Sequence, residues 1–136
     1  MSDGTLKADL TALSTTLTRL HKALMDHQFK KYEKDQGRIQ HNGEKLQLLL
    51  SHTDFQWLRP LSHAIADLDD QVESDSMDGA EIKGTLKEIE LLLFSDRHKT
   101  FSEQYQPFEP GTPEIILLHQ ELKNSLQSIS KKNPDA

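Results

Sequence analysis

Residues 6–24 read LKADLTALSTTLTRLHKAL, and this stretch decides the fold. Its leucines are spaced alternately four and three residues apart, at Leu6, Leu10, Leu13, Leu17, Leu20 and Leu24. This alternation places them all along one side of an α-helix. The pattern predicts a long amphipathic helix that continues past Tyr32 and ends near Gly37, a typical helix C-cap. At roughly 1.5 Å per residue it is about 45 Å long, so other helices must cover its leucine face.

Three later stretches carry single apolar stripes with the same helical spacing. Their members are Trp57, Leu61, Ile65, Leu68 and Val72, then Ile82, Leu86, Ile89 and Leu93, and finally Ile115, Leu118, Leu122, Leu126 and Ile129. Local signals mark helix starts at Thr53 or Asp54, at Asp78 and at Thr112-Pro113. Pro60 predicts either a kink or a helix start beside Arg59. The stripe that runs across it favours a kinked, continuous helix.

Between these stripes lie shorter segments. The dense leucines of residues 44–51 predict a buried turn or two of helix. Residues 95–111, with Phe101, Tyr105 and Phe108, predict an irregular segment that packs back on the helices. Gly84 weakens its helix by about 1 kcal/mol relative to Ala, which indicates a close helix crossing there. The tail at about 131–136 is expected to fray.

Composition supports an all-α fold in one domain. The 136 residues include 21 Leu but one Val, whereas strands favour β-branched residues. The length leaves no room for a second core of normal size. We therefore predict an all-α, antiparallel helical bundle of four long helices plus one short buried helix, with residues 1–136 as a single domain.

The sequence also excludes several classes of function. The absence of cysteine rules out disulfides, thiol nucleophiles and Cys-based metal sites. The longest apolar runs, at residues 91–94 and 115–118, are far shorter than the roughly 20 residues that a bilayer span needs. The N-terminus lacks the basic start and apolar stretch of a signal peptide, so we expect a cytoplasmic protein. Phosphate-binding glycine loops and the common hydrolase and zinc motifs are missing as well.

Charge is unevenly distributed along a chain whose formal net charge is −6. This acidic balance makes nucleic acid an unlikely partner. A basic cluster consists of Lys30, Lys31, Lys34 and Arg38, and an acidic cluster of Asp67, Asp69, Asp70, Glu73, Asp75 and Asp78. Both fit solvated helix surfaces. They also fit complementary patches that steer a partner, including a second copy of the chain.

Among the seven histidines, three are candidates for a metal or ligand site. His63, Asp67 and Asp70 share one helix face, opposite the apolar stripe, so they form a weak metal candidate that points to solvent. His119 falls inside the last apolar stripe, and His21 flanks the first. Each fits either a structural polar contact or a functional histidine in a pocket.

Arg59 lies between Trp57 and Pro60 in the sequence. One interpretation is structural, with the guanidinium stacked on Trp57 or bonded to carbonyls near the proline. The other is an anion or carboxylate contact in a groove. Arg59, Trp57, His21 and His119 are thus the ligand-binding candidates, and no residue is predicted to be catalytic.

The stretch FQWLRPLS at residues 55–62 resembles a motif in a group of small bacterial all-α proteins of uncharacterised function. The LHKAL of residues 20–24, Tyr32-Glu33 and the GRI of residues 37–39 fit the layout of that group, whose first helix is long and rich in leucine. The resemblance covers roughly residues 15–75. It implies a bacterial origin and no particular activity.

The sequence therefore predicts a non-enzymatic helical-bundle protein without a cofactor that acts through protein–protein contacts, including self-association as a homodimer. The outward-pointing Leu91, Ile116 and Leu117 are candidates for such a surface or for covering a neighbouring helix. The alternative is a ligand- or metal-binding bundle, with or without catalysis.

Overall fold

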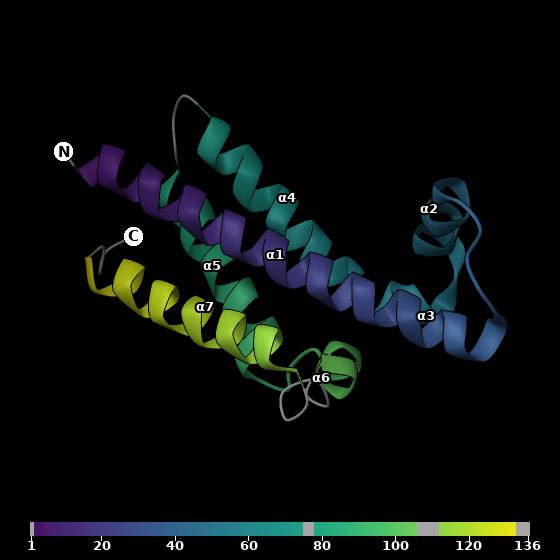
Figure 1. The fold of residues 1–136 in the computed structure, drawn as a ribbon. Coiled ribbons are helices and arrows are strands. Elements are labelled where there is room, and N and C mark those ends of the chain that lie inside the picture. The colour runs from purple at the N-terminus through teal and green to yellow at the C-terminus, as the bar shows by residue number, and fades with distance from the viewer. Residues whose placement is uncertain (1, 75–77, 106–111, 133–136) are drawn as a thin grey trace.

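The computed structural model describes residues 2–74, 78–105 and 112–132, and every regular element in them is an α-helix (Figure 1). The predicted all-α class is confirmed. In chain order the helices are α1 (Ser2–Gln36), α2 (Asn42–Ser51), α3 (Thr53–Gln56), α4 (Arg59–Glu73), α5 (Gly79–Phe94), α6 (Lys99–Tyr105) and α7 (Pro113–Lys132).

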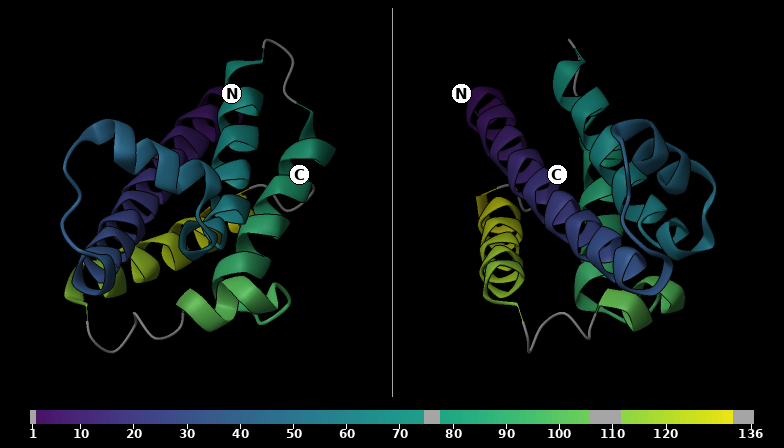
Figure 2. Two further views of the ribbon diagram at one scale, coloured as in Figure 1. Left: turned by 90° about the vertical axis from the view of Figure 1, so that its right-hand side faces the viewer. Right: turned by 45° about the vertical axis from the view of Figure 1, so that its right-hand side comes forward.

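The four longer helices pack into a bundle around α1. Helices α4 and α7 both pack against α1 and run antiparallel to it, while α5 packs against α4 and, less extensively, against α7 (Figures 1 and 2). The leucine face of α1 is the centre of the core, because Leu10, Leu13, Leu17, Leu20 and Leu24 are completely buried. This confirms the helix predicted from their spacing.

The predicted end of α1 near Gly37 is also confirmed. Gly37 has a φ of +94°, a backbone conformation that residues with a Cβ rarely adopt. Its N–H donates to the Glu33 carbonyl (2.9 Å). The Glu33 carboxylate in turn accepts a hydrogen bond from the backbone N–H of Ile39 (2.9 Å), which turns the chain toward α2.

The expected continuous helix across Pro60 is wrong. Helix α3 ends at Gln56, and α4 begins at Arg59 with Pro60 in its first turn. Trp57 and Leu58 join the two helices in αR conformations. Because proline lacks an N–H and has a fixed φ, it suits a helix start better than a helix interior. A run of apolar side chains on one face can therefore cross a boundary between two helices.

Helix α5 begins where the sequence predicts, but Gly84 does not have the role that we expected. The Asp78 carboxylate accepts hydrogen bonds from the N–H groups of Ala80 (2.9 Å) and Glu81 (3.4 Å), as an N-cap does. The predicted close helix crossing at Gly84 is wrong. A Cβ at that position would meet nothing within 4 Å.

The segment after α5 is more regular than expected. Instead of an irregular chain, residues 99–105 form α6, which buries Phe101 and Tyr105 against the bundle. Phe108 lies outside the described residues. Helix α7 starts at Pro113, as predicted, and includes Lys131 and Lys132. The rest of the tail that was expected to fray lies outside the described residues.

Helix α2 is not the buried element that its leucines predict. Of these leucines only Leu48 is buried, and Leu49 is half-buried. Leu46 and Leu50 are 58% and 63% exposed. Figure 1 shows α2 beside the C-terminal part of α1, where it contacts α3. Among the described helices, none is both long enough and apolar enough to cross a membrane.

Candidate functional site

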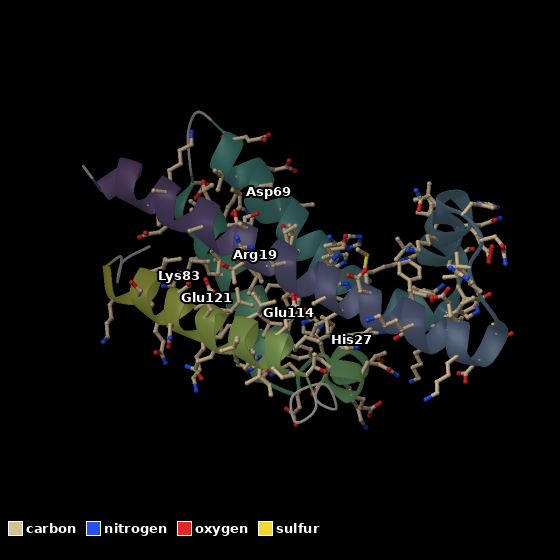
Figure 3. All side chains as sticks on the ribbon, viewed as in Figure 1. Arg19, His27, Asp69, Lys83, Glu114 and Glu121 are labelled. Atoms are coloured by element: carbon tan, nitrogen blue, oxygen red, sulfur yellow. The ribbon has the colours of Figure 1, made fainter. Side chains whose placement is uncertain are left out.

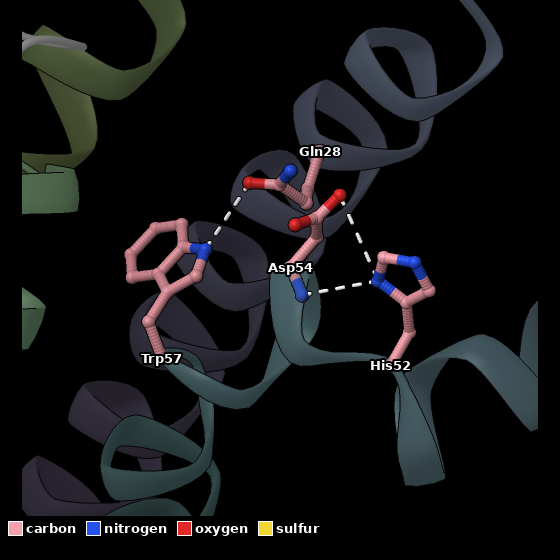
Figure 4. A network of polar contacts seen from close by, with 4 residues as sticks. All are labelled: Gln28, His52, Asp54 and Trp57. Atoms are coloured by element: carbon pink, nitrogen blue, oxygen red, sulfur yellow. Dashed lines mark hydrogen bonds and ion pairs between the residues drawn. The ribbon is translucent and has the colours of Figure 1, made fainter. Parts of the chain in front are cut away.

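Trp57 is fixed at the junction of α3 and α4 by a buried polar contact with α1. Its indole Nε1–H donates to Oε1 of Gln28 (3.1 Å), as Figure 4 shows. The two residues are only 6% and 5% exposed. Trp57 also packs against Phe101 of α6, with ring centroids 5.5 Å apart. One tryptophan thus joins three parts of the chain that are distant in sequence.

Trp57 and Gln28 line a cavity of about 670 Å³ where α1, α3, α4 and α6 meet. Its charged wall residues are of both signs, with Lys31 and Lys99 against Asp35 and Asp54. Phe101 and Pro60 supply apolar wall, and His98 lies at the same opening. The Nε2 of His98 is 2.8 Å from the Glu88 carboxylate, so this imidazole already has an acidic partner. The volume is within the range of small-molecule sites.

Asp54 and His52 form the outer side of this region (Figure 4). The Nδ1 of His52 accepts a hydrogen bond from the Asp54 backbone N–H (3.1 Å) and lies 3.6 Å from its carboxylate. The His52 ring also packs edge-on against Tyr32, with centroids 5.3 Å apart. These contacts position the start of α3 against the end of α1.

Arg59 has a structural role in this conformation. It is exposed, and one guanidinium N–H donates to the Leu50 carbonyl near the C-terminal end of α2 (2.6 Å). This matches the interpretation in which the guanidinium binds a backbone carbonyl, although that carbonyl belongs to α2. Arg59 is not among the residues that line the cavity beside Trp57.

His119 forms a second polar pair, with Tyr105. The Tyr105 hydroxyl oxygen and His119 Nδ1 are 2.6 Å apart, and Phe94 packs edge-on against the imidazole with centroids 4.7 Å apart. Tyr105 is 2% exposed. The pair borders another cavity, of about 650 Å³, whose wall includes Asp96 and Lys123. The contact connects α6 to α7.

The other predicted candidates lie apart from both cavities. His21 is half-buried on α1, and burial lowers the pKa of its imidazole from the ordinary value of 6.5. His63, Asp67 and Asp70 are all exposed on α4. In the part of the chain that the structure describes, no group of three or more His, Asp or Glu residues is arranged to hold a metal ion.

The charged clusters occupy opposite ends of the bundle. The basic residues Lys30, Lys31, Lys34 and Arg38 are exposed at or just beyond the C-terminal end of α1. Asp67, Asp69, Asp70, Glu73 and Asp78 are exposed at or just beyond the C-terminal end of α4, and Asp75 lies outside the described residues. Asp69 also accepts a hydrogen bond from the Ser14 hydroxyl, so it joins α4 to α1 (Figure 3).

Sequence reasoning missed Gln28 and the partner of His119. A signal for Gln28 existed, since it lies four residues after Leu24 and extends the buried face of α1 with a polar side chain. Tyr105 gave no such signal, because its helix was not predicted. Comparisons of the chain with protein-family models, with curated proteins and with solved structures found no match.

Proposed function

We propose that the protein acts through protein–protein contact, and that the contact surface is the exposed leucine face of α2. The observation that supports this is the exposure of Leu46 (58%) and Leu50 (63%). They are four residues apart, so they lie on the same face of the helix. Paired exposed leucines on one face are typical of a helix that docks into an apolar groove.

The opposite face of α2 is anchored, so the exposed face has a defined position. Leu48 packs in a small apolar cluster with Phe29, Ile39 and Phe55. Arg59 holds the Leu50 carbonyl from the start of α4. A helix fixed in this way presents its leucines without first having to become ordered, which reduces the entropic cost of binding.

The partner that we propose is a second copy of the chain. An apolar groove of about 660 Å³ lies between α1, α5 and α7, with Leu6, Ile82, Leu86, Leu126 and Ile129 in its walls. Its lining residues include Leu6 near the start of α1 and Ser130 near the end of α7. Figure 1 shows these two helix ends at the opposite end of the molecule from α2. Two copies related by a two-fold axis can each insert α2 into the groove of the other, which closes the assembly as a dimer.

Charge favours the same arrangement. The basic cluster is at the α2 end of the molecule, while the acidic cluster is at the groove end. Inserting α2 into the groove of a second copy brings the basic cluster of each chain toward the acidic cluster of the other. Such complementarity raises the association rate and disfavours the parallel arrangement, in which like charges meet.

In this proposal the protein is non-enzymatic, cytoplasmic and independent of a cofactor. The dimer is the functional form of the protein, and the acidic and basic ends select the orientation of the partner. The bacterial family resemblance around FQWLRPLS adds no activity to this proposal.

The experiment is sedimentation velocity over a range of concentrations. We expect the wild-type chain to reach twice its monomer mass of 15.5 kDa. Replacing both leucines, Leu46→Gln with Leu50→Gln, should weaken association about 400-fold or more. The dimer buries four of these leucines, each about 60% exposed in the single chain, and full burial of a leucine contributes about 1.5–3 kcal/mol. Leu117→Gln is the matched control, since Leu117 is 70% exposed on α7 and is not part of the groove. A wild-type chain that stays monomeric, or a double variant that associates like wild type, would contradict the proposal.

A further inference from the structure

The Gln28 side chain has an amide nitrogen without a hydrogen-bond partner among the described residues. Gln28 is 5% exposed, and its Oε1 is used by the indole of Trp57. An indole N–H can only donate, so the amide oxygen must face Trp57 and the amide nitrogen must face away from it. No residue in the described part of the chain accepts a hydrogen bond from that nitrogen. This nitrogen is not among the fully buried atoms, so water or a ligand in the cavity beside Gln28 can be its acceptor.

That donor belongs to the cavity that Gln28 and Trp57 line. The wall of the cavity also carries uncommitted charges. Among the described residues, no ion pair engages Lys31, Lys99 or Asp35, although all three border the same opening. Asp54 supplies a second carboxylate, which lies near His52. Two ammonium groups and two carboxylates thus line the same cavity as the Gln28 amide.

We propose that this cavity binds a small zwitterion of the α-amino-acid class. The ligand carboxylate accepts from the Gln28 amide nitrogen and pairs with Lys31 or Lys99. The ligand ammonium pairs with Asp35 or Asp54. The ligand side chain lies against the apolar wall made by Pro60, Phe101 and the edge of Trp57.

The balance of charge selects a zwitterion over a simple ion. A monoanion would be attracted by the two lysines and repelled by the two aspartates, and a monocation would meet the reverse. A ligand with both charges pairs with both sets at once, and charge-assisted hydrogen bonds are the stronger ones. All four charged side chains are exposed, so water screens these pairs and each contributes modestly. This site is separate from the α2 leucine face, so it does not depend on the proposed self-association.

The chain provides its own reporter, because Trp57 is its only tryptophan. We expect L-leucine to change the Trp57 emission saturably. The analogues 4-methylpentanoate and 3-methylbutylamine, which each keep one of the two charges, should bind about tenfold more weakly or worse. No saturable change with millimolar L-leucine, or binding of either analogue as tight as that of L-leucine, would overturn the proposal.

Variants separate the roles of the wall residues. Gln28→Glu keeps an oxygen for the Trp57 indole but replaces the amide donor, so L-leucine should bind about 10-fold to 100-fold more weakly. Gln127→Glu, on the exposed side of α7, adds the same charge elsewhere and should leave binding unchanged. The four charged wall residues are exposed, so their replacement leaves the core intact. Replacing both lysines, Lys31→Gln with Lys99→Gln, should weaken binding of the acid analogue alone, and Asp35→Asn with Asp54→Asn should weaken binding of the amine analogue alone. Full binding by Gln28→Glu in a folded protein, or no selective loss in either exposed variant, would refute the site.

Discussion

The hydrogen bond between Gln28 and Trp57 predicts how much one substitution lowers the free energy of unfolding. Gln28→Leu retains the size and burial of the side chain but removes the acceptor of the indole N–H. Trp57 is only 6% exposed, so its donor has little contact with bulk water. A buried donor without a partner costs about 1–3 kcal/mol. We therefore expect Gln28→Leu to lower the free energy of unfolding by about this amount.

The assay is urea unfolding followed by circular dichroism, which does not depend on the tryptophan signal. Gln127→Leu is the matched control, because Gln127 is exposed on α7 and the same substitution there should change the free energy of unfolding by no more than about 0.5 kcal/mol. Adding Trp57→Phe completes a double-mutant cycle. In the Gln28→Leu background this second change removes a donor that has already lost its acceptor, so the two costs should overlap by about 1 kcal/mol.

Two results would refute this reasoning. The first is a Gln28→Leu variant as stable as wild type, which would mean that water reaches the indole nitrogen. The second is full additivity of the two substitutions, which would mean that the hydrogen bond does not couple α1 to the start of α4.

Three further predictions test the packing and the titration of the fold. Gly84→Ala should raise the free energy of unfolding by up to about 1 kcal/mol, and with it the thermal midpoint, because the new methyl group meets no atom. Gly37→Ala, at φ +94°, should lower the thermal midpoint. Leu17→Ala, at a fully buried site, should cost about 3–5 kcal/mol in urea unfolding, and Leu117→Ala, 70% exposed, close to nothing. Burial lowers the pKa of His21, so the unfolded chain takes up a proton that the folded chain resists. The contribution of His21 to the free energy of unfolding should be complete above pH 6.5 and should decline as the pH falls toward the lowered pKa. Urea unfolding at several pH values measures this decline, and His21→Gln should remove it.

Much of the fold follows from local patterns in the sequence. The spacing of the α1 leucines identifies their buried face, and a glycine after a helix or an aspartate before one marks an end through its own backbone chemistry. These features depend on residues within a few positions of one another. For this reason the end of α1, the start of α5 and the start of α7 were predicted correctly.

The errors come from contacts between distant residues. Whether Pro60 kinks a helix or starts one depends on how Trp57 packs against Gln28 and Phe101. The exposure of Leu46 and Leu50 follows from the anchoring of α2 at a single leucine and at Arg59. The hydrogen bond between Tyr105 and His119 requires α6, which no local pattern indicated. In the candidate site, sequence pointed to Trp57 but could not place Gln28 beside it.

A crosslinking measurement tests the central proposal most directly, that α2 of one chain lies in the groove of another. The chain has no cysteine, so single cysteines introduced at Leu46 and at Ser130, an exposed residue of the groove, report on one pair of surfaces. The Leu46→Cys and Ser130→Cys proteins are mixed and oxidised, with each protein oxidised alone as the control. Our account predicts that the mixture forms a disulfide-linked pair containing one chain of each kind, in excess over both like pairs. Like pairs alone, or no crosslinked species at concentrations where the wild-type chain associates, would contradict it.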